Sequence, residues 1–173
     1  MVDYPWYATA EGDQPLEQGH FVKDCPVVVP PKAEAGDEPL VEIKEYDVVV
    51  VSQSCDLRNE KIELVLVCSV WLLDEFNGCG GLFKGDEGRE SLRRGNVHGY
   101  HLLNKCEIAD FQTDFLVVDF RSVYGVDYGF LRDLCMKNGK RLSLLPPYRE
   151  HLSQAFARFF MRVGLPADIP AFK

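Results

Sequence analysis

The chain has 173 residues, close to the usual size of one domain, so two separate cores would be cramped. Hydrophobic residues make up 46% of the sequence and charged residues 27%, which excludes a disordered composition. The formal net charge of -8 disfavours nucleic-acid binding, because proteins that grip a phosphate backbone usually present a basic face.

The sequence shows no sign of export or membrane insertion. Its first residues lack the basic and apolar regions of a signal peptide, and the longest apolar runs, residues 48–51 and 64–67, are far too short to cross a membrane. We therefore expect a cytoplasmic protein without membrane contact, whose six cysteines are free thiols. No two cysteines have the CxxC spacing of a zinc knuckle or a thioredoxin-type motif.

The N-terminal third predicts an arm, an edge strand and a loop. Residues 1–18 are polar and rich in turn formers, and we expect them to lie over the surface, held by Trp6 and Tyr7. Residues 20–29 favour a strand, which Pro26 confines to an edge or a break because proline lacks the amide donor. Residues 30–39 form a loop by composition.

A hairpin follows. Residues 41–44 begin a strand and a turn at 46–47 leads into Val48, Val49, Val50 and Val51. Four consecutive β-branched residues favour a strand that is buried on both faces. Residues 52–59 form a polar connection, and residues 62–67 return as a second buried strand.

The remainder alternates short strands and helices. Residues 69–76 are compatible with a helix that ends at Asn77-Gly78. The later segments are a charged helix or loop at 84–94, strands at 100–103, 115–120 and 122–126, a short helix at 127–136 and a strand at 141–145.

The final helix has the clearest pattern. It is expected from Pro147 to a C-terminal cap at Gly164. Its apolar residues recur at helical spacing and predict one buried face: Leu152, Ala155, Phe156, Phe159, Phe160 and Val163.

These elements predict a single α+β domain over residues 1–173. It comprises a surface arm (1–18), a β-rich core with short helices (19–145) and a C-terminal amphipathic helix (147–163). The preferred architecture is a small, partly open antiparallel β-barrel of SH3-like type.

The polar segment after the four valines is the candidate binding site. It places hydroxyl, amide, thiol, carboxylate and guanidinium groups within seven positions at the end of a rigid strand: Ser52, Gln53, Ser54, Cys55, Asp56 and Arg58. The alternative interpretation is a turn in which Ser52, Asp56 and Asn59 satisfy main-chain groups.

Chemistry at this segment would need a base or a metal. Cys55 becomes a nucleophile only beside a cation or base, and His98 and His101 are the candidates if their strand lies next to the hairpin. The same histidines with Cys55 and either Cys106 or Cys79 form a possible zinc ligand set, but their spacing lacks paired-ligand support, so no metal and no cofactor is expected.

Two other patterns are of types that can form sites. Asp114 and Asp119 flank an apolar run that Arg121 follows, which favours a structural ion pair between Asp119 and Arg121. The glycines at 78–81 follow no strong strand and lack a Lys-Ser/Thr pair, so they do not indicate a phosphate-binding loop.

Several stretches resemble a set of uncharacterised bacterial proteins over most of the chain. These stretches are residues 18–22, 47–57 with the sequence DVVVVSQSCDL, 117–121, 147–152 and 160–164. A second similarity, to the small SH3-like barrels of the MazF/PemK growth-inhibitor toxins, rests on Gly19-His20-Phe21 and on residues 61–67, although the Arg-Pro element of those toxins is absent.

We expect an accessory module of a bacterial defence or toxin–antitoxin system, because the acidic balance, the lack of a complete catalytic signature and the barrel-like pattern all permit it. Such a module would bind a ligand or another protein from the same operon through residues 52–59, and a homodimer through edge strands is left open. The alternative is a hydrolase, either a MazF-like endoribonuclease that uses Asp56, Arg58 and a histidine such as His101, or a Cys55-dependent enzyme.

Overall fold

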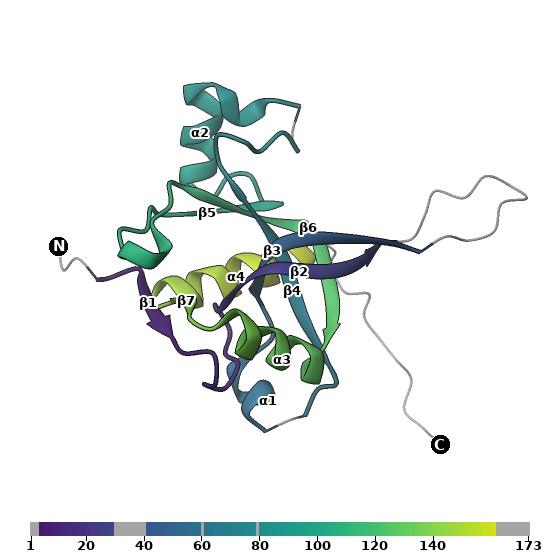
Figure 1. The fold of residues 1–173 in the computed structure, drawn as a ribbon. Coiled ribbons are helices and arrows are strands. Elements are labelled where there is room, and N and C mark those ends of the chain that lie inside the picture. Colours follow the sequence, from purple (N-terminus) through teal and green to yellow (C-terminus); the bar gives the residue numbers. More distant parts are fainter. Residues whose placement is uncertain (1–3, 30–40, 60, 79, 162–173) are drawn as a thin grey trace, which may run out of the picture.

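The computed structural model describes residues 4–29, 41–59, 61–78 and 80–161. Within these ranges the chain forms seven strands, four α-helices and two 3₁₀ turns (Figure 1). The strands are β1 (Tyr7–Ala10), β2 (Phe21–Val29), β3 (Glu42–Val50), β4 (Leu64–Leu72), β5 (Tyr100–Leu103), β6 (Leu116–Asp127) and β7 (Arg141–Leu144). The helices are α1 (Ser54–Arg58), α2 (Asp86–Arg93), α3 (Tyr128–Asn138) and α4 (Tyr148–Phe160), and the 3₁₀ turns are η1 (Leu82–Lys84) and η2 (Ala109–Phe111).

The strands form two antiparallel sheets that meet at residues 19 and 20. Five strands pair in the order β2-β3-β4-β6-β5, and β1 pairs with β7. His20 bridges Ser143 of β7, while its carbonyl accepts the Val50 amide of β3 at 2.9 Å. Gly19 has a φ of 84°, and a Cβ there would lie 3.0 Å from the Leu144 Cβ, so this junction requires glycine.

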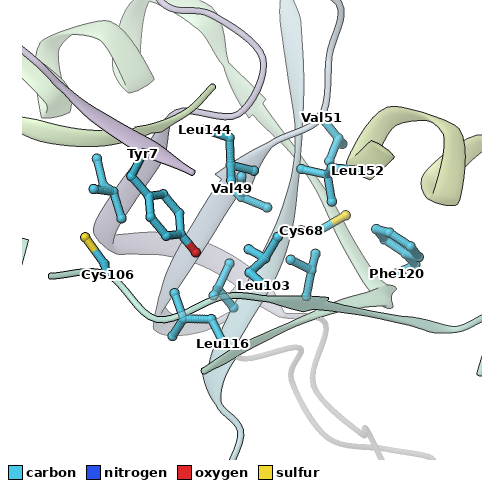
Figure 2. Packing of buried hydrophobic residues seen from close by; sticks show 13 residues of the cluster. Tyr7, Val49, Val51, Cys68, Leu103, Cys106, Leu116, Phe120, Leu144 and Leu152 are labelled. Atoms are coloured by element: carbon cyan, nitrogen blue, oxygen red, sulfur yellow. The ribbon is translucent and has the colours of Figure 1, made fainter. Parts of the chain in front are cut away.

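The four valines are fully enclosed because the two sheet faces are covered by different groups. Val49 and Val51 belong to one hydrophobic cluster, which includes Leu152 of α4 (Figure 2). Val48 and Val50 belong to a second cluster on the opposite face, with Leu131 of α3. Side chains alternate along a strand, so consecutive valines fill two cores, and the predicted two-faced burial is confirmed.

The N-terminal segment contributes to the core and does not simply lie over the surface. β1 pairs with β7, and Tyr7 and Leu16 are buried. The Trp6 ring stacks on Tyr148 of α4 with centroids 3.6 Å apart. The expected anchoring by Trp6 and Tyr7 is confirmed, but residues 7–18 are built into the domain.

Other segments differ from the sequence-based expectations because sheet pairing overrides local pattern. Residues 69–72 continue β4 and do not begin a helix, β3 runs straight through positions 46–47 without a turn, and the runs at 115–120 and 122–126 form a single strand. In α4, Leu152 is buried and Phe156 and Phe159 are partly buried, whereas Phe160 is 58% exposed; Val163 and Gly164 lie outside the described residues.

The predicted hairpin, the edge position of Pro26 in β2 and the C-terminal helix are confirmed. The α+β class is also confirmed, with antiparallel pairing throughout, but the described strands do not form a closed barrel. In the part of the chain that the structure describes, no helix is long and apolar enough to cross a membrane.

Truncation of the enclosed valines tests this packing. We expect Val49→Ala and Val50→Ala each to lower the free energy of unfolding by about 2 kcal/mol, because each leaves a cavity in one of the two clusters. Val28→Ala, at a position 62% exposed, is the matched control and should change it by less than about 0.5 kcal/mol. Urea denaturation measures all three, and an effect of Val49→Ala as small as that of the control would contradict the described packing.

Candidate functional site

The predicted polar segment forms the turn and short helix between β3 and β4. The Ser52 hydroxyl accepts the Leu66 amide at 2.8 Å, and the Ser54 hydroxyl accepts the Gln18 amide at 3.1 Å. Leu57 is completely buried in the cluster that contains α3. The two serines therefore satisfy main-chain groups, as in the alternative turn interpretation.

The other side chains of the segment point to different neighbours. Gln53 donates to the Ser153 hydroxyl of α4 at 3.2 Å. Cys55 is exposed, and its sulfur lies 3.8 Å from a carboxylate oxygen of Asp56. The segment thus holds its thiol and acid side by side and directs its amide toward α4.

Arg58 belongs to a small charged cluster with the N-terminal segment. It forms an ion pair with Glu17, whose second carboxylate oxygen lies 3.5 Å from Arg149 of α4. Burial tends to raise the pKa of Glu17, but the Arg58 hydrogen bond and the surrounding positive charges lower it overall. The carboxylate is therefore ionised and links three segments of the chain.

Sequence reasoning missed a buried polar pair beneath this cluster. His20 and Arg141 are each 4% exposed, and the Arg141 Nε donates to the His20 Nδ1 at 2.9 Å. The Arg141 guanidinium also donates to main-chain carbonyls of the turn that precedes Leu16, among them Glu11 at 2.7 Å and Gln14 at 2.6 Å. The partners are 121 residues apart, so no local pattern could have indicated the pair.

The candidate base does not reach the candidate nucleophile. His101 lies on β5, at the far edge of the five-stranded sheet, and two strands separate β5 from β3. Its ring stacks on Phe120, and burial together with His151 lowers its pKa to about 4. His98 is exposed in the turn before β5.

No metal site is formed by the described residues. Among them, no three His, Cys, Asp or Glu side chains are close enough to hold a metal ion. Cys106 is buried near Tyr7, away from the exposed Cys55, and Cys79 lies outside the described residues.

The Asp119–Arg121 pair predicted from the sequence is present. The Arg121 Nε lies 3.2 Å from Asp119, and the guanidinium covers the Tyr100 ring at 4.4 Å. Burial raises the Asp119 pKa, while hydrogen bonds from the Arg121 amide and from Ser122 act in the opposite direction. The pair fixes β6 where its register against β4 shifts.

A concave feature lies where β3 separates from β4, and we call it the β3–β4 groove. In the described ranges, residues 48–50 of β3 pair with residues 67–69 of β4, and the pairing does not continue beyond Val48 and Ser69. Beyond this point a groove of about 730 Å³ opens between them. Its apolar lining comes mainly from the α4-side cluster: Phe21, Val70, Leu72, Phe111, Leu116 and Leu142.

The rim of the β3–β4 groove is mostly acidic. Five carboxylates line it, Asp24, Glu45, Asp47, Glu75 and Asp110, against the exposed amines of Lys23 and Lys140. None of the residues 52–58 lines this groove. The polar segment predicted from the sequence and the β3–β4 groove are therefore separate surfaces.

Two acidic residues of β3, Glu45 and Asp47, explain why β3 separates from β4. Val51 donates to the Leu66 carbonyl of β4, and Val50 to the His20 carbonyl on the other side. By alternation, Glu45 and Asp47 share the side-chain face of Val49, which faces the α4-side cluster. A carboxylate cannot enter that cluster without a large desolvation cost, so two-faced burial ends at Val48.

The comparisons with known proteins identify no family. No protein-family model matches the sequence, and no curated protein matches it.

The His20–Arg141 pair predicts a pH-dependent stability. Burial and the Arg141 charge lower the His20 pKa from 6.5 to about 4, and Nδ1 must stay unprotonated to accept its two hydrogen bonds. Because the unfolded chain binds the proton more readily, stability is lost as pH falls through 6.5 toward 4. We expect His20 to account for about 2 kcal/mol of the loss between pH 7 and pH 5.

Urea denaturation of His20→Gln at both pH values measures this contribution. The variant should be destabilised at pH 7 but lose less stability on acidification than the original chain. The exposed His98→Gln is the control and should retain the full pH dependence. Equal pH dependence in His20→Gln and the original chain would contradict the buried, neutral imidazole.

Proposed function

We propose that this chain is a protein-binding accessory module whose binding surface is the β3–β4 groove, and that its partner is a polypeptide with net positive charge. The groove supports this proposal because it combines an apolar lining with an acidic rim. Interfaces with an apolar centre and a polar rim are typical of protein recognition. The five rim carboxylates favour a basic partner through charge complementarity.

The bacterial setting inferred from the resemblance is part of the same proposal. The partner would be another protein from the same operon, in a defence or toxin–antitoxin system in the cytoplasm. A partly open, SH3-like barrel is proposed as the architecture, since β1 approaches the end of β5 through the Tyr7 hydroxyl, which donates to the Asn104 carbonyl at 2.6 Å. The chain's acidic total also fits a basic protein better than a nucleic acid.

The 52–58 segment is proposed as a secondary contact surface. Cys55 and Arg58 are exposed on α1, which the buried Leu57 fixes, and Gln53 is exposed directly before this helix. For the hydrolase alternative, the described contacts of Cys55 supply Asp56 but neither a histidine nor another base. The binding function therefore has the stronger support.

A selection experiment tests the proposal. Random ten-residue peptides displayed on phage are selected against the full chain, and the enriched peptides should carry Lys or Arg together with apolar residues. The variant Glu45→Lys/Glu75→Lys reverses two exposed rim charges and should weaken binding of the enriched peptides about tenfold or more.

The matched control is Glu63→Lys/Asp133→Lys, which makes the same change in net charge at exposed positions outside the groove. This control should change the affinity for the enriched peptides less than about twofold. The measurement is made at physiological salt, which screens long-range attraction between charges. No enrichment, or equal losses in the two variants, would refute the groove as the site. A dimer of the chain that only the rim variant dissociates would assign the groove to a second copy and overturn the basic partner.

A further inference from the structure

The β3–β4 groove is bordered by main-chain groups that have no ladder partner among the residues that the structure describes. The Val51 amide donates to the Leu66 carbonyl of β4. Main-chain groups point to alternate sides along a strand, so this hydrogen bond indicates which residues of β3 direct their amides and carbonyls toward β4. Glu45 and Asp47 continue this series beyond the paired region, and Val70 and the Leu72 amide continue it on β4, where the Leu72 carbonyl already accepts the Glu75 and Phe76 amides.

The residue between Glu45 and Asp47 and the residue between Val70 and Leu72 are already paired with the strand on the side away from the groove. Tyr46 pairs with Cys25 of β2, and Trp71 pairs with Val117 of β6. Each border of the groove is therefore an open edge on a strand whose opposite edge is occupied. Two antiparallel edges thus flank one apolar-lined space, and the Tyr46 and Trp71 rings from the two strands contact each other beside it, with centroids 5.8 Å apart.

Open strand edges are normally blocked, because they pair with any extended chain that reaches them. Here each open edge lies inside the β3–β4 groove. The outer edges of the sheet are formed by β2 and β5. The acids at Glu45 and Asp47 repel acidic segments and leave the main-chain groups accessible to a basic one.

We infer that the partner contributes an extended segment that adds as a strand in the β3–β4 groove. This inference rests on the proposed function and specifies how the partner binds. The segment hydrogen-bonds to the free edge of β3 at Glu45 and Asp47, or on β4 to Val70 and the Leu72 amide. Alternate apolar side chains face the lining formed by Phe21, Phe111 and Leu142, and Lys or Arg side chains meet the acidic rim.

The sequence requirement of such a segment is specific. Strand side chains alternate between two faces, so every second residue would be apolar and the intervening residues basic or polar. A helical segment would instead place its apolar residues three and four positions apart. The spacing of apolar residues in the selected peptides therefore separates the two binding modes.

Nuclear magnetic resonance of the full chain with the tightest selected peptide tests the binding mode directly. Strand addition predicts short contacts between peptide and protein main-chain protons at Glu45 to Asp47 or at Val70 to Leu72, and slowed exchange of the facing amides. Peptide binding without main-chain contacts at either border would overturn strand addition while leaving the proposed function intact. An absence of peptide binding would instead count against the proposed function itself.

Proline substitution provides an independent test. The Val50 amide bonds on the β2 side and the Val51 amide on the β4 side, so by alternation the Glu45 amide is expected to face the groove. Glu45→Pro should then remove a donor to the peptide and leave the β2–β3 hydrogen bonds intact. If the segment adds to β3, affinity should fall about tenfold or more, whereas Glu45→Gln should lower it only modestly. Leu72→N-methyl-leucine, introduced by semisynthesis, makes the same test on β4. Full affinity in both blocked proteins, each shown to be folded by its amide spectrum, would overturn the inference.

Discussion

The structure depends on four consecutive valines that are enclosed on both faces. Val49 and Val51 fill the cluster beneath α4, and Val48 and Val50 fill the cluster beneath α3, so one short stretch of chain joins both cores. Main-chain hydrogen bonds from residues 19 and 20 fix the same stretch at its other edge and tie it to β7. Displacing this strand would disturb both cores and the junction of the two sheets.

The β3–β4 groove forms because the burial of β3 on both faces ends at Val48. The apolar run gives way to Asp47 and Glu45, whose carboxylates would otherwise face the α4-side cluster. Because burying an unpaired carboxylate is costly, β3 separates from β4 and continues beside β2 as the ribbon seen in Figure 1. A change of residue type over a few positions thus produces both the rigid centre of the sheet and the opening next to it.

Sequence reasoning succeeded where the signal was local. Four valines in succession specify a buried strand whatever surrounds them, and the apolar spacing around Leu152 specifies α4. It failed where long-range pairing decides the outcome. The residues after Ser69 look compatible with a helix, but pairing with β6 holds them in a strand.

The functional surface was harder to predict for the same reason. The polar segment 52–58 is conspicuous in the sequence, yet its serines satisfy main-chain groups and His101 lies across the sheet from Cys55. The β3–β4 groove collects residues from β2, β3, β4, η2 and the turn before β7, none of which form a motif. The buried Arg141–His20 pair likewise depends on a register that only the folded chain defines.

β3 and β4 are paired up to Val48, and their main chains are unpaired beyond it. Amide hydrogen exchange of the unliganded full chain tests this at neighbouring positions of the same strands. Val49 and Cys68, which face each other across the paired region, should exchange at least about a hundredfold more slowly than Asp47 and Val70, which face the groove. Equal protection of all four amides would mean that the strands close together in solution, and the groove would not exist as a binding surface.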